Sequence, residues 1–254
     1  MDVHILGTHP GERSHRYILT TYVVNGELAI DAGALGIGLS PAEQQHIHTV
    51  LLTHSHMDHV ATLPIFIDNR IAEPGRPPTI IATAPTLEAL RRHVFNDVLW
   101  PDLQRISSQF YSLRTVAPHA QEEIPDFSFR FFPVNHPVPT CGVVLQEKST
   151  GHQVLFSSDT TACDAIWVEA GRCENLRGIF IEVSFPNAFE SLAASSGHLT
   201  PSLLGAELQK LDRPVPIYLT HYKSIYVEAI REEIQAIHGH SLHICLAGEL
   251  IHLE

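Results

Sequence analysis

Four side chains that can bind a metal ion stand within six residues of one another. They are His54, His56, Asp58 and His59, in the segment 54–59. Imidazole and carboxylate groups suit zinc, manganese or iron, and no nearby cysteine suggests a closed thiolate site. An open catalytic metal usually takes three protein ligands, so this segment is expected to contribute to two metal ions. A solvated polar loop or a purely structural metal site is the alternative.

The elements that position these donors follow from the hydrophobic pattern. The apolar run His48–Thr53 predicts a buried strand, so the donors fan out from the loop at its end. Strands in runs and hairpins, with helices between some of them, favour packed sheets flanked by helices over one doubly wound sheet. The other predicted strands are Val3–Leu6, Tyr17–Val24, Leu28–Asp31, Phe127–Val134, Gly142–Glu147, Val154–Ser157, Gly178–Val183 and Val215–Thr220.

The predicted helices lie between and after these strands. The segment 63–118 is expected to be a helical insertion within a single domain that spans residues 1–254. It could form a wall for a substrate's base or a dimer contact. The predicted helices are Pro41–His46, Thr86–Trp100 with Val98 on its apolar face, a helix capped by Thr200 that runs to about Leu211, and about Ile225 to His238.

Three more candidate donors follow later predicted strands: His136, Asp159 and His221. With residues 54–59, this ordered set resembles the metallo-β-lactamase superfamily along nearly the whole chain. The resemblance implies a mixed α/β (α+β) fold, a four-layer αββα sandwich with the site at one edge of the two sheets. It also implies two divalent metal ions, with zinc as the first choice and manganese or iron as alternatives.

The resemblance further implies a role for each donor. Two metal ions about 3.5–4 Å apart could share a hydroxide and stabilise a phosphoryl or carbonyl transition state. Asp31 resembles an early acidic residue that would orient a metal-bound histidine, although a turn cap before Gly33 is an equal alternative. His54, His56 and His136 would hold one ion; Asp58, His59 and His221 would hold the second, with Asp159 bridging.

Three further segments resemble the class II cyclic-nucleotide phosphodiesterases: 182–185, 197–200 and 220–223. In that family, a histidine in the position of His198 lies near the scissile phosphate. A histidine outside the ligand set could protonate the departing 3′-oxygen or stabilise charge on phosphorus.

The predicted catalytic residues are His198, Lys223 and the metal ligand Asp58. Lys223 could neutralise a phosphate oxygen, since it lies two residues after a predicted ligand. The expected reaction is hydrolysis of a 3′,5′-cyclic nucleotide to the 5′-nucleotide by a metal-bridging hydroxide. The alternatives are an RNase Z-like phosphodiesterase, a lactonase or a thioesterase, or a metal-binding domain without catalysis.

The composition limits the classes of molecule that the chain is expected to bind. The 254 residues include 18 His, 28 Asp and Glu, and 16 Lys and Arg, for a net charge of −12. This charge argues against a broad face for nucleic acid, so a small-molecule substrate is expected. No apolar run approaches the roughly 20 residues of a membrane span. With no evident signal peptide and no CxxC pairing among its 4 cysteines, the chain is expected to be cytoplasmic. A homodimer is left open.

Overall fold

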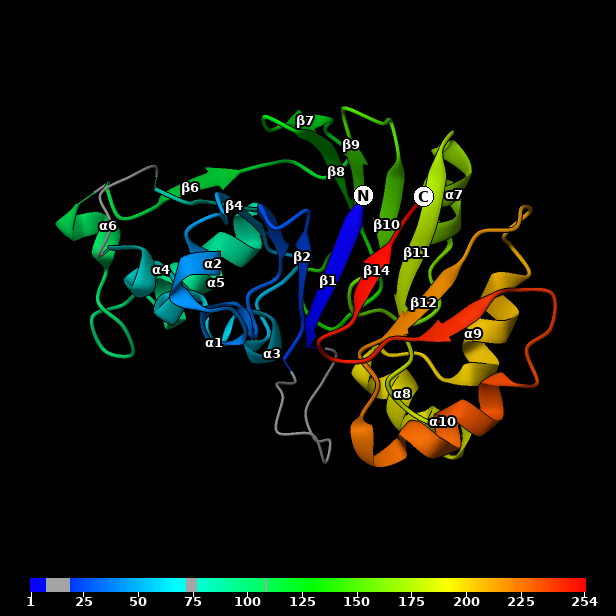
Figure 1. Cartoon of the computed structure of the whole chain (residues 1–254). Helices are drawn as coiled ribbons and strands as arrows, with labels where there is room; N and C mark the ends of the chain where they lie inside the picture. The colour runs from blue at the N-terminus through cyan, green and yellow to red at the C-terminus, as the bar shows by residue number, and fades with distance from the viewer. Residues whose placement is uncertain (8–18, 72–76, 108) are drawn as a thin grey trace.

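The computed structural model describes residues 1–7, 19–71, 77–107 and 109–254. Within these ranges two seven-stranded sheets face each other, and helices cover both outer sides (Figure 1). Tyr17 and Ile18, at the start of one predicted strand, lie outside the described residues.

The first sheet is built mainly from the N-terminal half of the chain and is closed at one edge by the last strand. Helices α1 (Leu35–Gly38), α2 (Pro41–Gln44), α3 (Met57–Val60), α4 (Leu63–Ile71), α5 (Ala84–His93) and α6 (Leu103–Ile106) accompany it. Its strand order is β14 (Leu250–His252), β1 (Asp2–Gly7), β2 (Thr21–Val24), β3 (Leu28–Ile30), β4 (Thr49–Leu51), β5 (Thr79–Ala82) and β6 (Ser112–Thr115).

The second sheet is built from the C-terminal half. Its helices are α7 (Asp164–Arg172), η1 (Asn187–Phe189), α8 (Glu190–Ser196), α9 (Pro201–Leu208), η2 (Ser224–Tyr226) and α10 (Val227–Ile234). Its strand order is β13 (Leu242–Ile244), β12 (Ile217–Thr220), β11 (Leu176–Glu182), β10 (Gln153–Phe156), β9 (Cys141–Glu147), β8 (Phe127–Pro133) and β7 (Glu122–Glu123).

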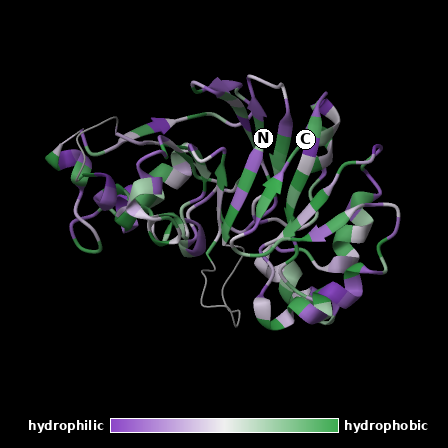
Figure 2. Cartoon of the chain, in the orientation of Figure 1, coloured by the Kyte–Doolittle hydropathy of each residue, from purple (hydrophilic) through white to green (hydrophobic). Residues whose placement is uncertain are grey.

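Three hydrophobic clusters fill the spaces between the four layers. Alternate residues of facing strands form the central cluster, such as Tyr22 of β2, whose ring centre lies 5.1 Å from that of Phe156 of β10. The other two lie between each sheet and its outer helices. In Figure 2, hydrophobic residues run along the strands in the middle of the molecule. The predicted αββα sandwich is confirmed.

The helix predicted over Thr86–Trp100 is wrong at both ends. The structure begins α5 at Ala84, and the chain leaves the helix after His93. The side chain of Asn96 accepts hydrogen bonds from the backbone N–H groups of Val98 and Leu99, and this local turn competes with the helix. Val98 is consequently 84% exposed and does not belong to an apolar helix face.

The segment 63–118, predicted to be helical, also contains two strands of the first sheet. β5 pairs in parallel with β4, and β6 pairs in parallel with β5. β5 has the sequence Thr-Ile-Ile-Ala, whose β-branched residues suit a buried strand, but four residues are too few to show a period. The insertion is therefore part of the first sheet as well as of its helical cover. None of the helices in the described ranges has the length and apolarity that a membrane crossing requires.

Gly33 lies between β3 and α1, where it packs against the residue before β2 and against helix α3, which carries two of the candidate metal ligands. Its N–H donates to the carbonyl of Thr20 (3.1 Å), and the N–H of Thr20 donates to the carbonyl of Asp58 (3.0 Å). A Cβ atom at position 33 would collide with the carbonyl oxygen of Asp58 and lie 2.8 Å from that of Thr20. Only glycine allows these three backbone segments to approach so closely.

We predict that Gly33→Ala lowers the free energy of unfolding by about 2 kcal/mol, the middle of the range for overpacking a core. Urea denaturation of the purified protein measures the change. Gly171→Ala is the matched control, because its Cβ would meet no atom within 4 Å on α7, and helical Gly to Ala changes are neutral or stabilising. Equal stability of the two variants would contradict the close approach at Gly33.

Candidate metal centre

The seven candidate ligands lie at the ends of strands that meet at one edge of the sandwich. Strands β10, β11 and β12 run parallel, so the residues that follow them emerge at the same edge of the second sheet. His54 and His56 follow β4, Asp58 and His59 stand in α3, His136 follows β8, Asp159 follows β10, and His221 follows β12. The structure thus brings together all seven residues that the sequence singled out.

The first group of donors consists of His54, His56, His136 and Asp159, whose ligand atoms all lie within 4.8 Å of one another. Nε2 of His136 is 3.1 Å from Nδ1 of His56. Nε2 of His54 is 3.7 Å from a carboxylate oxygen of Asp159. That nitrogen is buried and has no hydrogen-bond partner. An orphaned buried nitrogen facing other donors fits a metal ligand.

The second group consists of Asp58, His59, Asp159 and His221. Nε2 of His221 lies 3.2 Å from a carboxylate oxygen of Asp58 and 3.3 Å from one of Asp159. Nε2 of His59 lies 3.2 Å from the other oxygen of Asp159. Asp159 therefore belongs to both groups, and the donor chemistry of each fits a divalent metal ion.

In four of the five candidate histidine ligands, the ring nitrogen that points away from the cluster contacts an oxygen atom. The Nδ1 atoms of His54, His59, His136 and His221 lie 2.6–3.0 Å from an oxygen of, respectively, Thr53, Asp31, Gly197 and Ser184. Each Nε2 is left facing the cluster. This arrangement of outer oxygens fixes ring orientation at metal centres.

The charge state of the donors follows from their surroundings. Burial lowers the pKa of His54, His56 and His136. Burial raises the pKa of Asp159, but the charges of His221 and His59 outweigh this effect and hold the pKa well below its usual range. Neutral imidazole and ionised carboxylate are the forms that bind metals, which fits these four residues. For His59, burial disfavours the protonated form, but the carboxylates of Asp159 and Asp31 raise its pKa overall.

Three residues at this edge adopt left-handed backbone conformations that are uncommon outside glycine. They are Asp31, Ser158 and His221, with φ of 59°, 58° and 55°. Such conformations cost about 1–3 kcal/mol each and persist where the surroundings fix them. The hydroxyl of Ser184 donates to the carbonyl of His221 at 2.9 Å, which holds one of them.

His198 lies beside the seven donors, as predicted, and is anchored by a buried carboxylate. Its Nδ1 is 2.6 Å from Oε1 of Glu182. Glu182 also accepts backbone N–H groups of Thr160, Ser184 and Leu199. Burial disfavours the protonated form of His198, but the charge of Glu182 and this hydrogen bond raise its pKa overall.

Sequence analysis did not assign a role to Glu182 or Ser184, which appeared only as part of a signature segment. The available signal was a charged residue at the end of an otherwise apolar strand. Ser184 Oγ lies 3.2 Å from Nδ1 of His198 and 3.0 Å from Nδ1 of His221. This pair thus connects His198 to a candidate ligand.

Lys223 lies at the margin of the cluster and is half-buried. Its Nζ stands 4.9 Å from the centre of the Phe185 ring. Its positive charge opposes protonation of His198. The structure therefore places Lys223 near His198, and it is not among the metal-donor groups.

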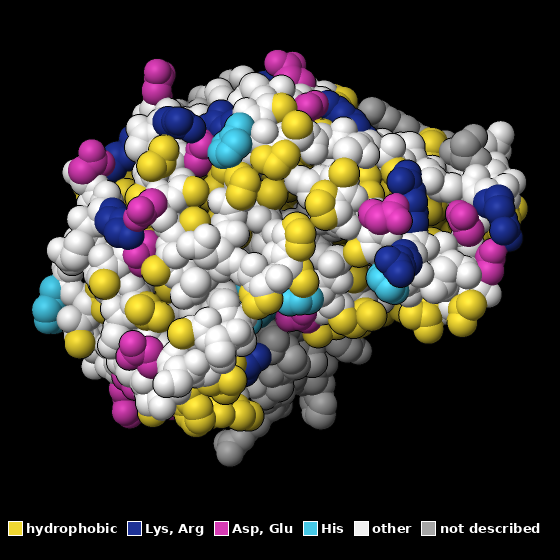
Figure 3. Space-filling view, turned by 180° about the vertical axis from the view of Figure 1, so that it is seen from behind, with side chains coloured by type: hydrophobic (Ala, Val, Ile, Leu, Met, Phe, Trp, Pro, Cys, Tyr) yellow, Lys and Arg dark blue, Asp and Glu magenta, His cyan; other side chains and the backbone are white. Residues whose placement is uncertain are grey.

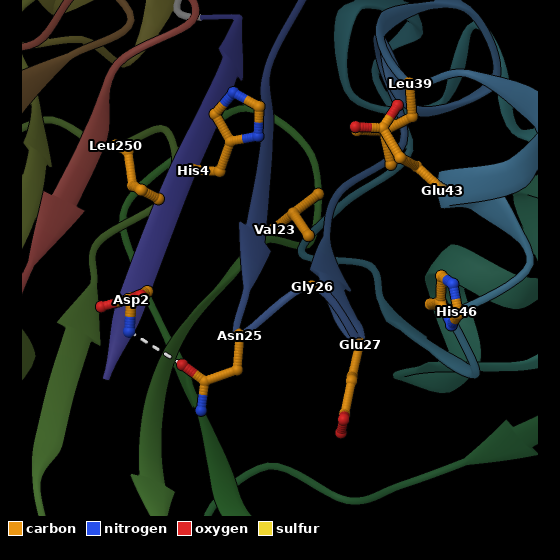
Figure 4. Close-up of a pocket in the computed structure, with 10 residues that line it drawn as sticks. All are labelled: Asp2, His4, Val23, Asn25, Gly26, Glu27, Leu39, Glu43, His46 and Leu250. Carbon is orange, nitrogen blue, oxygen red and sulfur yellow. Dashed lines mark hydrogen bonds between the residues drawn. The ribbon is translucent and has the colours of Figure 1, made fainter.

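The cavity in Figure 4 is separate from the cluster. It has a volume of about 580 Å³ and is lined by residues of β1, β2, β14 and the α1–α2 region. Two of its three acidic groups have structural partners: Glu43 accepts the N-cap N–H of Ser40, and Asp2 pairs with His252. None of the donors in the described residues lines this cavity.

Asp31 holds His59 and the end of β4 together, which favours the orienting role over a turn cap. Its carboxylate lies 2.6 Å from Nδ1 of His59 and accepts the N–H and hydroxyl of Thr53. We predict that Asp31→Asn weakens metal binding about 10- to 100-fold, as outer partners of metal ligands usually do. Competition with a chromophoric chelator measures the affinity. An unchanged affinity would contradict the orienting role, and a thermal melt by circular dichroism separates this effect from unfolding.

Comparison with known proteins identifies the family of the chain. A family model described as "Beta-lactamase superfamily domain" matches residues 32–222. A 3′,5′-cyclic-nucleotide phosphodiesterase of Schizosaccharomyces pombe is 34% identical over 214 residues, covering 71% of this chain and 59% of that protein. A probable 3′,5′-cyclic-nucleotide phosphodiesterase of Yersinia pestis is 25% identical over 205 residues, covering 71% of this chain and 58% of that protein. The chain thus spans less than two thirds of the length of these relatives.

The crystal structure of unliganded yeast PDE1 has the same fold. The two structures agree with a TM-score of 0.85 over 98% of both chains, at 19% sequence identity. The family match extends from the residue after Asp31 to the residue after His221, and so contains all seven candidate ligands. The chain belongs to the beta-lactamase superfamily.

Proposed function

We propose that this chain is a metal-dependent phosphodiesterase that opens the cyclic phosphate of a 3′,5′-cyclic nucleotide and releases the 5′-nucleotide. The observation that carries the proposal is the position of His198. Its ring centre lies 5.2 Å from that of His136 and 5.5 Å from that of His221, one from each donor group. A thioesterase or lactonase would need the metals but no such group directed at a phosphate. The names of the similar proteins support the same reaction.

The proposed site holds two divalent metal ions, with zinc preferred and manganese or iron as alternatives. Held there, the ions would activate a water molecule and stabilise the negative charge that develops on the phosphate. His54, His56 and His136 would hold one ion, Asp58, His59 and His221 the other, and Asp159 would contact both.

The proposed role of His198 is to protonate the leaving 3′-oxygen. Because Nδ1 is engaged by Glu182, Nε2 is the nitrogen that can face a substrate. The carboxylate of Glu182 stabilises the imidazolium, so a proton is held on the ring until the P–O3′ bond breaks. Asp58 would help to hold the second metal ion. Lys223 would neutralise a phosphate oxygen, because its amine lies over the ring of Phe185, whose centre is 5.9 Å from that of His198.

The proposed substrate is a small molecule rather than an extended nucleic acid. On the face shown in Figure 3, Lys and Arg side chains are scattered and mostly lie beside acidic ones. Polynucleotide binding draws on many cations along one surface. The net charge of −12 fits a substrate with a single phosphate better.

A turnover screen of the purified protein tests the proposal. The substrates are cyclic AMP, cyclic GMP, a chromogenic phosphodiester, a thioester and a lactone, with metal analysis of the same sample. Selective hydrolysis of a cyclic nucleotide is the expected result. Turnover of the thioester or lactone alone would contradict it.

We predict that dialysis against a chelator abolishes cyclic-nucleotide hydrolysis, and that adding zinc or manganese restores it. The reason is that the metal ions held by the clustered donors would supply the activated water in the proposed reaction. Residual metal is measured by atomic emission in each sample. Full activity in a sample shown to be free of metal would contradict the prediction.

We predict that His198→Ala lowers kcat on cyclic AMP by about 100- to 10,000-fold, the usual contribution of a positioned general acid. The metal content of the variant should equal that of the wild type, since His198 is outside the ligand set. His238→Ala is the control, because His238 is exposed on the surface. A fully active His198→Ala enzyme would exclude the acid role.

A further inference from the structure

A row of aromatic rings leads outward from His198. The ring centre of Phe185 lies 5.9 Å from that of His198, and the ring centre of Tyr226 lies 6.4 Å from that of Phe185. Phe189 follows, with its ring centre 4.9 Å from Tyr226 and its plane tilted by 34°. The row thus begins at the proposed proton donor.

The inner and outer ends of the row differ in exposure. Phe185 is buried, at 4% exposed, so it belongs to the packing around the site. Phe189, which ends η1, is 38% exposed, and Tyr226 of η2 is half-buried. An aromatic ring left partly open at the surface offers a stacking face to a flat ligand.

We propose that Phe189 and Tyr226 form the platform on which the nucleobase of the substrate stacks. This inference rests on the proposed function and names the part of the substrate that gives it selectivity. With the phosphate at the metal cluster and the 3′-oxygen at His198, the sugar and base must continue away from the metals. The aromatic row starts at His198, and its outer rings, Tyr226 and Phe189, are the ones that offer apolar surface to the base.

A second apolar surface near the cluster is less well placed for the base. A cavity of about 690 Å³ is lined by residues of the loop 133–141, by the segment 83–85 and by the segment 115–118. His136 contributes to it, but the His136 side chain is only 1% exposed and faces the donors. The exposed part of His136 is therefore its backbone, so the loop separates this cavity from the reacting atoms.

The experiment compares two ligands that differ only in the base. Isothermal titration calorimetry on the metal-loaded protein measures Kd for adenosine 5′-monophosphate and for ribose 5-phosphate. The Kd for ribose 5-phosphate divided by the Kd for adenosine 5′-monophosphate reports the contribution of the base alone. We expect Phe189→Ala and Tyr226→Ala each to lower this ratio about 5- to 100-fold, the range for losing one aromatic stacking partner.

Controls separate stacking from general apolar contact. Phe189→Trp should keep the ratio, because it preserves a ring, whereas Phe189→Leu should lower it. Leu192→Ala removes an exposed apolar side chain from the neighbouring helix α8 and should leave the ratio as in the wild type. Ala84→Leu narrows the other cavity and should also leave it unchanged.

Two results would overturn the platform. One is a wild-type protein that binds both ligands equally; the other is a ratio lowered by Ala84→Leu but not by Phe189→Ala. The calorimetry needs no turnover, so its outcome is independent of the proposed activity. A protein that shows the expected ratios but hydrolyses no cyclic nucleotide would contradict the proposed function and support the platform.

Discussion

The buried carboxylate of Asp159 is the group on which the geometry of the site depends. It is 2% exposed and lies within 4.0 Å of histidines from both halves of the chain: His54 and His59 after β4, and His136 and His221 after strands of the second sheet. An isolated buried carboxylate costs several kcal/mol, so it must be surrounded by partners of opposite charge or by metal. The edges of the two sheets therefore have to meet where Asp159 emerges, and the site exists only when the sandwich is closed.

Groups around the cluster keep its geometry fixed. Oxygen atoms that contact the outer ring nitrogens set the rotation of the imidazoles, and the hydrogen bond from the Ser184 hydroxyl to the carbonyl of His221 supports the strained backbone there. The Ser184 hydroxyl oxygen also lies 3.2 Å from Nδ1 of His198, and Glu182 contacts both residues: it accepts the backbone N–H of Ser184 and lies 2.6 Å from that same nitrogen. Through these two residues, the orientation of a candidate metal ligand and that of the proposed proton donor depend on one network.

The sequence predicted the site more completely than the elements around it. The candidate ligands could be identified because each has a side chain that can bind a metal ion and lies at or shortly after the end of a predicted strand. These residues are the donors of segment 54–59 and the later His136, Asp159 and His221. The cap at Thr200 was also predictable, because a side-chain oxygen before a proline has a local signature; the structure confirms it. The turn at Asn96 was missed because it depends on a hydrogen bond from the backbone to the Asn96 side chain, which the apolar spacing does not reveal. Strand β5 was missed because it depends on pairing with β4, and four residues are too few to show a period. Glu182 was missed as the partner of His198 because its role depends on distant segments that meet only in the folded chain.

We propose that two metal ions share Asp159. A crystal structure of the metal-loaded protein, with anomalous data collected at the absorption edge of the bound metal, tests this arrangement most directly. We predict two peaks about 3.5–4 Å apart, one beside His54, His56 and His136 and the other beside Asp58, His59 and His221. A single peak in the loaded protein, or a second peak away from Asp159, would contradict it.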